Sequence, residues 1–341
     1  MALYPLLRPL IFRIEAERAH HFSLATLERA PRRAPPRVDA RLAVRVAGLD
    51  FPSPVGLAAG YDKDARVPDA MLGLGFGFVE VGTLTPLPQA GNPRPRLFRL
   101  AEDRAVINRM GFNNGGQADA LVRLARRARR GIVGVNVGAN KDAVDRTADY
   151  ATGVAAMAPV ADYLTVNISS PNTPGLRALQ EAAALDALLE RVMAARGAHG
   201  PPVFLKVAPD LERADIHAIS KVAIDRGVGA LIVANTTVSR PPLISAHAGE
   251  QGGLSGEPLR PLALQRLRDF RSATGGALPL VAAGGIASAE DAFASIRAGA
   301  SLVQLYSALV YEGPGLAKRI AQGLARLLER EGYASVADAI G

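Results

Sequence analysis

The chain contains no cysteine among its 341 residues and only five histidines. The absence of cysteine excludes disulfides, thiolate zinc sites, cysteine-ligated iron–sulfur clusters and any cysteine nucleophile or base. The histidines are scattered: His20 and His21 lie near the N-terminus, whereas His199, His217 and His247 lack the spacing of a zinc-binding helix motif. We therefore expect no structural metal.

The sequence also has no long uncharged apolar run. The N-terminal segment MALYPLLRPLIFRIEAERAHHF is interrupted by Arg8 and Arg13, lacks a basic start and has no clear small-residue cleavage site. It therefore fits a signal peptide or a membrane span poorly and is better described as amphipathic. Its arginines could meet anionic lipid.

The overall composition is that of a globular protein, with 49% hydrophobic and 21% charged residues. The net charge is +8, and residues 123–130, RLARRARR, form a dense basic cluster. Nucleic acid is one possible partner for such a cluster. Because Ala, Leu and Val alternate with these arginines at helical spacing and few aromatics accompany them, a solvated helix face is favoured.

Short apolar runs rich in Val, Ile and Leu recur along the chain, each followed by polar or Gly-rich residues. Stretches with helical spacing lie between them. This alternation indicates a parallel sheet covered by helices, and eight units indicate a closed (β/α)8 TIM barrel. A doubly wound open sheet is the alternative, although no GxGxxG follows the first run. The predicted strands are residues 55–59, 77–82, 132–137, 162–168, 203–208, 230–235, 279–284 and 301–306.

Polar side chains or glycines follow each predicted strand. A TIM barrel has its active site at the carboxyl ends of its strands, so these residues should converge on one mouth. Any single one could instead form a turn or cap a helix, but the repetition favours a functional mouth. The residues are Asp62, Lys63, Thr83, Thr85, Asn136, Asn140, Asn167, Ser170, Asn172, Lys206, Asn235, Thr236, Thr237, Gly284, Gly285, Tyr306 and Ser307.

The loops after the last two strands are common phosphate sites in such barrels. In AAGGIASAED, Gly284 and Gly285 would let the backbone approach an anion, and Ser288 could cap the next helix. Residues 252–256, GGLSG, add a second glycine-rich loop. A simple tight turn is the alternative. The pattern favours a cofactor with one phosphate tail, such as FMN, over a dinucleotide.

Two lysines end predicted strands, where a buried cation needs an anionic partner. Lys63 and Lys206 could face a bound anion, and positive charge beside a flavin favours its anionic reduced form. An ion pair with Asp62, Asp64 or Asp210 is the alternative.

Four asparagines form the remaining unusual group. An amide carries both a donor and an acceptor, so a ring of amides complements a heterocycle edge that alternates N–H and C=O, as in a pyrimidinedione. These residues are Asn108, Asn167, Asn172 and Asn235.

The segment NISSPNTPGLR, residues 167–177, follows an apolar run and cannot continue a strand or a helix. An ordinary turn is one interpretation, and an active-site lid is the other. Ser170 is its fourth residue.

With these motifs in place, the chain resembles the dihydroorotate dehydrogenases, specifically the quinone-reducing class 2 enzymes. The resemblance extends along most of the chain, and INRMGFNN and NISSPNTPGLR are its most specific motifs. The others are ERAHHF, GLAAGYDKD, EVGTLTP, PRLFRL, GVNVGANKD, LKVAPD, ANTT, GGLSG, GGI and LVQLYS.

The resemblance implies a barrel with one tightly bound FMN and a substrate pocket for dihydroorotate. The implied FMN residues are Ala59, Gly60, Lys63, Thr83, Asn136, Asn167, Lys206, Ala234, Gly256, Gly285, Tyr306 and Ser307. Ala234 stands where the family often has threonine, which puts a side-chain contact there in question. The implied substrate residues are Lys63, Asn108, Arg109, Met110, Gly111, Phe112, Asn167, Asn172, Asn235 and Thr236.

The resemblance also implies the chemistry: Ser170 would remove a ring proton while hydride passes to the flavin, giving orotate for pyrimidine (UMP) biosynthesis. Class 1 relatives use cysteine as the base, which this chain lacks. A serine base needs a hydroxyl or water to relay its proton, and Thr173 is nearby in the sequence.

Residues 1–37 resemble the helical segment by which class 2 enzymes admit a membrane quinone, and residues 38–341 resemble the catalytic barrel. His20 and Arg99 match positions at the quinone site, although a lone histidine is more often structural. The resemblance implies a peripheral protein on the cytoplasmic face of a bacterial cell membrane, and the segment's arginines suit anionic headgroups.

Two other interpretations compete with this one. A flavin barrel acting on tRNA uridine would suit the basic charge, but such enzymes typically use a cysteine acid. A barrel that binds RNA or membrane and has lost its site is supported only by the arginine cluster. We therefore expect no nucleic-acid partner.

Overall fold

The chain forms a closed parallel barrel. The computed structural model describes residues 4–31 and 33–341. Within them the barrel order is β10-β12-β13-β3-β4-β7-β8-β9, and every neighbouring pair is parallel. This confirms the predicted TIM barrel and excludes the open sheet. The strands are β3 (Val55–Leu57), β4 (Phe78–Leu84), β7 (Ile132–Val137), β8 (Tyr163–Asn167), β9 (Val203–Val207), β10 (Ala230–Val233), β12 (Leu280–Ala283) and β13 (Ala300–Leu305).

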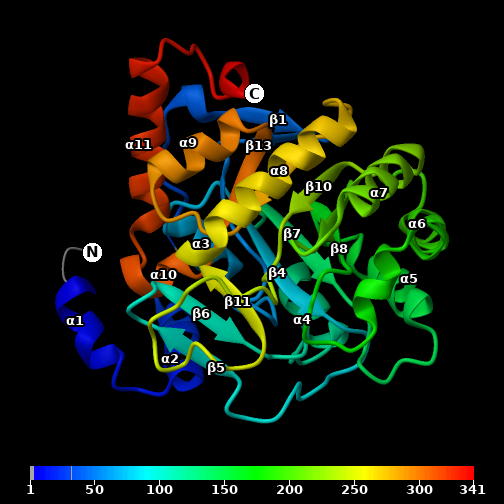
Figure 1. The fold of residues 1–341 in the computed structure, drawn as a ribbon, viewed down its shortest axis with the longest axis horizontal. Helices are drawn as coiled ribbons and strands as arrows, with labels where there is room; N and C mark the ends of the chain where they lie inside the picture. Colours follow the sequence, from blue (N-terminus) through cyan, green and yellow to red (C-terminus); the bar gives the residue numbers. More distant parts are fainter. Residues whose placement is uncertain (1–3, 32) are drawn as a thin grey trace.

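Helices cover the outside of the barrel (Figure 1). Their apolar faces follow the helical repeat; α11, for example, buries Ile320, Leu324, Leu327 and Leu328. Ser288 caps α9 in a capping box with Asp291, as predicted. The outer helices are α3 (Pro68–Gly73), α4 (Gln117–Ala125), α5 (Arg146–Met157), α6 (Ala182–Arg196), α7 (Arg213–Asp225), α8 (Arg260–Thr274), α9 (Ala289–Arg297), α10 (Ala308–Glu312) and α11 (Leu316–Arg330), with short 3-10 turns at Ala40–Leu42, Leu176–Gln180, Glu257–Leu259 and Ala337–Ala339.

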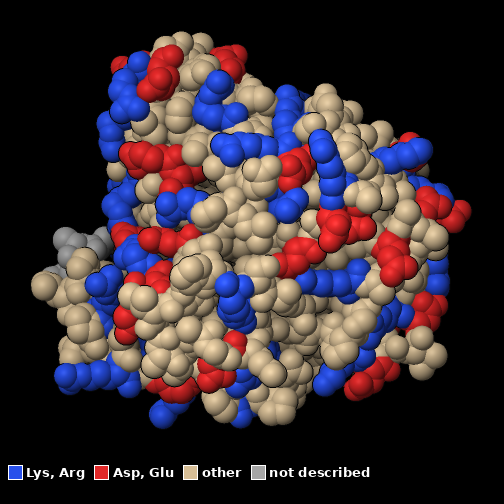
Figure 2. Space-filling view, viewed as in Figure 1, with Lys and Arg blue, Asp and Glu red and all other residues tan. Residues whose placement is uncertain are grey.

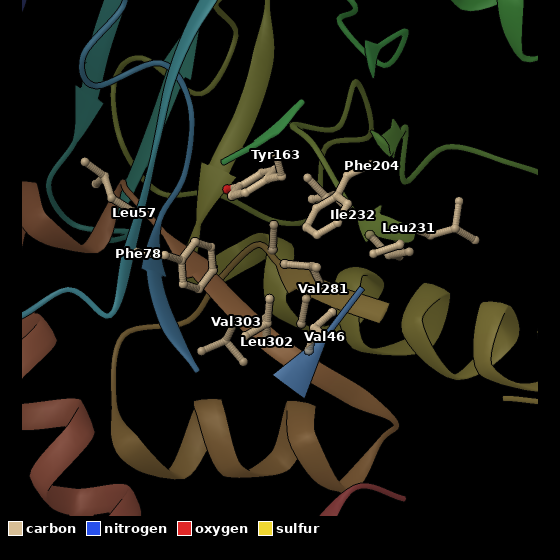
Figure 3. Packing of buried hydrophobic residues seen from close by; sticks show 14 of the residues in the cluster. Val46, Leu57, Phe78, Tyr163, Phe204, Leu231, Ile232, Val281, Leu302 and Val303 are labelled. Atoms are coloured by element: carbon tan, nitrogen blue, oxygen red, sulfur yellow. The ribbon is translucent and has the colours of Figure 1, made fainter. Parts of the chain in front are cut away.

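Aromatic rings fill the barrel interior where glycines leave room for them. A Cβ on Gly56 would lie 2.2 Å from the Phe78 ring, and one on Gly134 would lie 2.1 Å from the Tyr163 ring. Figure 3 shows these rings directed toward the other core side chains. Because protein interiors are close-packed, each glycine and its facing ring act as one packing unit.

A hairpin closes one end of the barrel. It consists of β1 (Val44–Val46) and β2 (Leu49–Phe51), which are antiparallel. The Phe51 ring meets Phe78 edge to face, with centroids 5.1 Å apart. The amino-terminal end of the barrel is thereby sealed by apolar side chains.

Additional elements gather at the opposite end (Figure 1). They are α1 (Tyr4–Ile11), α2 (Ala16–Arg29) and a three-stranded antiparallel sheet of β5 (Leu97–Leu100), β6 (Ala105–Asn108) and β11 (Gly253–Gly256). The prediction that residues 252–256 form a loop is therefore wrong for most of the segment. Its glycines avoid collisions with neighbours: a Cβ on Gly253 would lie 2.0 Å from the Thr236 hydroxyl.

The basic cluster is only partly a helix face. Helix α4 ends at Ala125, so most of the predicted arginine face lies beyond it. Arg127 pairs with Asp69 at 3.1 Å, and Arg123 donates to the Asp64 carbonyl. Over the face shown in Figure 2, basic and acidic side chains are interspersed. Part of the cluster thus serves local structural contacts, whereas Arg126 and Arg130 are exposed.

Candidate active site

A cavity of about 540 Å³ runs from the N-terminal helices to the carboxyl ends of the barrel strands. It brings Ser170 and Lys206 into one space with His20 of α2 and Arg99 of β5. Four of the strand-end residues predicted at the mouth, Asp62, Thr85, Asn140 and Thr237, do not line the cavity. All the site residues implied by the resemblance do, with two exceptions, Asn136 and Arg109. The two halves of the predicted site, far apart in the sequence, therefore share one interior.

The two exceptions have identifiable causes. Asn136 lies one layer deeper, where it accepts from the Thr83 hydroxyl at 2.6 Å. The Arg109 guanidinium bonds Glu250 at 2.8 Å and lies over the Phe98 ring, so its side chain is held away from the cavity. The prediction that the stretch 108–112 contacts substrate stays a prediction, with the Arg109 side chain directed to Glu250.

Ser170 is buried in a frame of asparagine amides. Its Oγ accepts from the backbone N–H of Asn172 at 3.2 Å. The Asn172 side chain donates to the Asn108 carbonyl at 3.1 Å, and Asn92 donates to the Asn172 carbonyl at 3.2 Å. In the described part of the chain no hydrogen bond joins Ser170 to Thr173, so the two hydroxyls are not directly linked.

A second polar layer connects the ends of β8 and β10. The Ser169 hydroxyl donates to Asn167 Oδ1 at 2.7 Å and accepts from Asn235 Nδ2 at 2.8 Å. Asn167 in turn donates to the Thr83 hydroxyl at 3.1 Å. These bonds fix which face each amide presents to the cavity. Ser169 was not predicted as a site residue, because no sequence pattern distinguishes it from the adjacent Ser170.

The two lysines lie in the cavity wall. Lys63 Nζ donates to the Gly60 carbonyl at 2.9 Å, and burial lowers the pKa of Lys63 to about 8 although Glu17 and Asp64 raise it. Burial also lowers the pKa of Lys206, with Glu80 acting in the opposite direction. Among the described residues neither lysine forms an ion pair, so both present charge to the cavity.

The acids proposed as their alternative partners are engaged elsewhere. Asp62 accepts from the backbone of Arg66 and Val67 at 2.7 Å each and holds the turn before α3. Asp210 pairs with Arg177 at 2.9 Å. The alternative of an ion pair with Asp62 or Asp210 at the mouth is therefore wrong.

A buried glutamate beneath the cavity was missed by the sequence analysis. Glu80 of β4 is fully buried, and its carboxylate accepts four hydrogen bonds, all from neutral groups. These contacts satisfy a carboxyl group that would otherwise be costly to bury. The donors are Asn136 at 2.7 Å, Gln304 at 2.8 Å, and Tyr163 and Thr165 at 3.1 Å each. An acidic residue inside the otherwise apolar predicted strand GFVEVG could have indicated it.

Glycines and hydroxyls form the end of the cavity after β12 and β13. Gly284 has φ +117° and Gly285 φ +74°, conformations that residues with a Cβ rarely adopt. The Ser255 and Ser307 hydroxyls are 2.7 Å apart. The backbone is therefore free of side chains at these two positions, and a phosphate site here stays a prediction.

The opposite end of the cavity is aromatic. The Tyr61 ring meets His20 at 5.3 Å and Tyr306 at 5.7 Å, edge to face in both cases. Ser23 donates to the His20 carbonyl at 2.7 Å, so its single proton is used and Tyr61 must donate to Ser23 at 3.0 Å. Burial, reinforced by the charge of Lys63, lowers the pKa of His20 to about 3. His20 is therefore neutral.

Arg99 holds the end of α1. It donates to the carbonyls of Ile11 at 3.4 Å, Phe12 at 3.3 Å and Ile14, and its guanidinium lies 4.7 Å from the Phe12 ring centroid. A cation at the C-terminus of a helix is favourable because the last carbonyls have no helical partner.

Helix α2 is anchored by a buried ion pair. Glu17 accepts from Arg96 at 2.7 and 3.1 Å and from Arg94 at 3.1 Å twice. Arg94 and Arg96 lie 77 and 79 positions after Glu17 in the sequence. Because no local pattern connects residues so far apart, this anchor could not be predicted.

The comparisons with known proteins match this geometry. A family model described as dihydroorotate dehydrogenase matches residues 41–328. A protein of Erythrobacter litoralis named dihydroorotate dehydrogenase (quinone) is 66% identical over 99% of both chains, and one of Sphingopyxis alaskensis with the same name is 65% identical over 100% of this chain and 97% of that one. A crystal structure of DHODH from Eimeria tenella in complex with ferulenol superposes with a TM-score of 0.91 at 40% identity, covering 95% of this chain and 94% of that chain.

Proposed function

The chain belongs to the dihydroorotate dehydrogenase family, and we infer that it oxidises dihydroorotate to orotate in pyrimidine biosynthesis and passes the electrons to a quinone. One cavity unites a buried serine, a frame of amides and two lysines that form no ion pair with any described residue. This combination supports the inference because dihydroorotate has a ring of alternating N–H and C=O groups, a carboxylate and a proton to be removed. Amides, positive charge and a base match these three features.

The chain's residues fit FMN as the cofactor, one per chain. Lys63 and Lys206 offer positive charge, and the glycines at the far end let the backbone approach a phosphate. Gln304 Oε1 is a buried acceptor that has no hydrogen-bond partner among the described residues. When bound, FMN takes two electrons from the substrate and gives them to the acceptor. The residues we propose to hold it are Ala59, Gly60, Lys63, Thr83, Asn167, Lys206, Ala234, Gly256, Gly285, Tyr306 and Ser307, together with Asn136, which acts from the layer beneath through its hydrogen bond with Thr83.

We propose that the amides position dihydroorotate and that Ser170 takes its ring proton. The buried Ser170 Oγ accepts only the weak 3.2 Å bond from Asn172, so a lone pair remains available. Because a serine hydroxyl is a poor base, its own proton must pass to water or a second hydroxyl. The residues proposed to contact substrate are Lys63, Asn108, Met110, Gly111, Phe112, Asn167, Asn172, Asn235 and Thr236.

Colour tests the function. The purified protein should be yellow, and dihydroorotate should bleach it without oxygen and yield orotate. Ser170→Ala should retain flavin and orotate binding but slow bleaching by at least ~100-fold, the lower range for loss of a general base. Colourless protein would contradict the flavin, and an unchanged single-turnover rate would remove Ser170 as the base.

We propose that residues 1–37 form a quinone-access segment on a membrane surface and that residues 38–341 form the catalytic barrel. The N-terminal helices expose Leu6, Leu10 and Phe22 to solvent, and Phe22 also lines the cavity together with other side chains of these helices. His20 and Arg99 lie where an apolar acceptor would enter. No helix within residues 4–31 and 33–341 is long and apolar enough to cross a membrane.

A lipid titration tests this placement, with the cytoplasmic face of a bacterial cell membrane as the proposed location. Vesicles with anionic headgroups should raise turnover of a long-chain quinone and bind the protein, and Leu6→Glu should reduce both without changing the bleaching rate. Equal turnover with and without vesicles would contradict the proposal.

A further inference from the structure

The guanidinium of Arg177 joins three loops at the barrel mouth. Its Nε donates to the Ser169 carbonyl at 3.1 Å, its Nη1 to Asp210 at 2.9 Å and its Nη2 to the Thr236 carbonyl at 3.2 Å. Ser169 follows β8, Asp210 follows β9 and Thr236 follows β10. Each of the three nitrogens thus bonds a different one of three consecutive loops.

Asp210 completes the connection from the other side. Besides Arg177, its carboxylate accepts from the Thr237 hydroxyl, from the Ser239 hydroxyl at 3.2 Å and from the Val238 N–H at 3.2 Å. The loop after β10 is therefore tied to the loop after β9 both directly and through the guanidinium.

The groups held by Arg177 adjoin the predicted chemistry. The bonded carbonyl of Ser169 belongs to the peptide unit that leads into Ser170. The Ser169 hydroxyl also accepts from Asn235, the neighbour of the second bonded carbonyl. A shift of either carbonyl would consequently move the serine relative to the amides around it.

We propose that Arg177 is a positioning residue that sets the place of the Ser170 hydroxyl relative to the bound substrate. This rests on the proposed function, because it takes Ser170 as the base. A base must lie within hydrogen-bond reach of the proton that it removes. A displacement of about 1 Å costs roughly 100-fold in rate. Arg177 can prevent such a displacement because it bonds the main chain beside Ser170, at Ser169, and the main chain of the proposed substrate residue Thr236.

Lysine cannot replace the guanidinium in this role. An ammonium is a point charge on a flexible stem, so it can stay near Asp210 but cannot hold three loops in one fixed plane. Arg177→Lys therefore separates charge from geometry. Arg226 provides a matched control: its side chain is 30% exposed, against 25% for Arg177, and it binds Asp186 at 2.6 and 2.7 Å on the barrel exterior.

The test measures single-turnover bleaching by dihydroorotate in holoenzyme, with Ser170 and with Ser170→Ala. Arg177→Gln and Arg177→Lys should each slow bleaching about 100-fold in the Ser170 protein but less than about 3-fold in the Ser170→Ala protein, because residues that act as a unit are not additive. Arg226→Gln should change neither rate. Orotate affinity, read from the flavin absorbance, should change less than about 3-fold.

Three results would overturn the proposal: equal slowing in both backgrounds, full activity of Arg177→Lys, or loss of orotate affinity in parallel with rate. If Arg177→Gln does not fold, Asp210→Asn replaces it, with the same non-additivity expected at a smaller size. Failure of the unmodified protein to bleach would refute the proposed function itself, whereas normal bleaching with additive variants would refute only the role of Arg177.

Discussion

Replacing Glu17 by glutamine should loosen α2 from the barrel far more than the same change at Glu28. Both carboxylates pair with barrel arginines, Glu28 with Arg66 through two 2.6 Å bonds. They differ in burial: Glu17 is 3% exposed and its partner Arg96 is 6% exposed, whereas Glu28 is 35% exposed. The two variants therefore compare a buried anchor with a solvent-screened one on a single helix.

The magnitude follows from the pKa of Glu17. Burial alone would raise this pKa, but hydrogen bonds from Arg96 and Arg94 outweigh it and lower the pKa from 4.5 to about 2. At 1.36 kcal/mol per pKa unit, this lowering corresponds to a stabilisation of the folded state by about 3 kcal/mol at neutral pH. Breaking a buried pair costs about 3–5 kcal/mol and an exposed pair about 0.2–1 kcal/mol. A glutamine NH2 would also face guanidinium donors.

The sign of the pH dependence is fixed by the lowered pKa. The stabilisation by Glu17 is complete above about pH 4.5 and is lost as the pH falls toward 2. At neutral pH the ion pair therefore contributes fully, and measurements there compare the two variants directly.

Amide hydrogen exchange across α2 is the assay. Glu17→Gln should speed exchange of the α2 amides about 100-fold, since 3 kcal/mol is about two decades, while Glu28→Gln should stay within about 5-fold of the unmodified protein. Unchanged barrel amides would confirm that the effect is local. Equal exchange in the two variants would refute the reasoning.

Three further predictions concern the N-terminus, the quinone end and the core. Deleting residues 1 to about 35, where Pro-rich linker signals begin, should abolish quinone reduction but keep orotate formation with a soluble dye; retained quinone turnover would contradict this. The pKa of His20 is about 3 in the folded protein and about 6.5 in the unfolded chain, so at pH 5 only the unfolded chain binds this proton, and the free energy of unfolding should fall by about 2 kcal/mol from pH 7 to pH 5. In urea titrations, His20→Gln should reduce this dependence on pH. An identical dependence in the variant would contradict a buried neutral imidazole. Glu80→Gln should destabilise the fold by about 3 kcal/mol, because a glutamine NH2 cannot accept the buried hydrogen bonds that a carboxyl oxygen accepts there. The surface control Glu331→Gln should cost under about 0.5 kcal/mol. Equal urea midpoints for the two variants would contradict a structural role for the Glu80 hydrogen bonds.

The barrel could be predicted because its signal is local. Each strand is a short apolar run such as IVGVNV, and each is followed by a helical repeat, so period and length alone separate the two. The strand ends then place Ser170 and Asn167 at one mouth through the known geometry of such barrels.

The contacts that set the geometry of the mouth could not be predicted. Arg177 meets Thr236 across 59 positions and Glu17 meets Arg96 across 79, and no period connects such pairs. The segment GGLSG was assigned to a loop because glycine usually breaks strands. It forms a strand because its backbone pairs with β6. Its first two residues are glycines because Asn108 and Thr236 lie too close for side chains there.

The ring and glycine pairs of the barrel floor constrain the order in which this protein can change over evolutionary time. A methyl group at Gly56 would lie 2.2 Å from the Phe78 ring, so Gly56→Ala is blocked while that ring remains. Phe78→Leu first creates a small void, which a later Gly56→Ala can fill. The two substitutions are therefore tolerated when Phe78→Leu comes first and not when Gly56→Ala comes first. A relative without an aromatic ring at position 78 can carry an alanine at position 56 that would destabilise this protein.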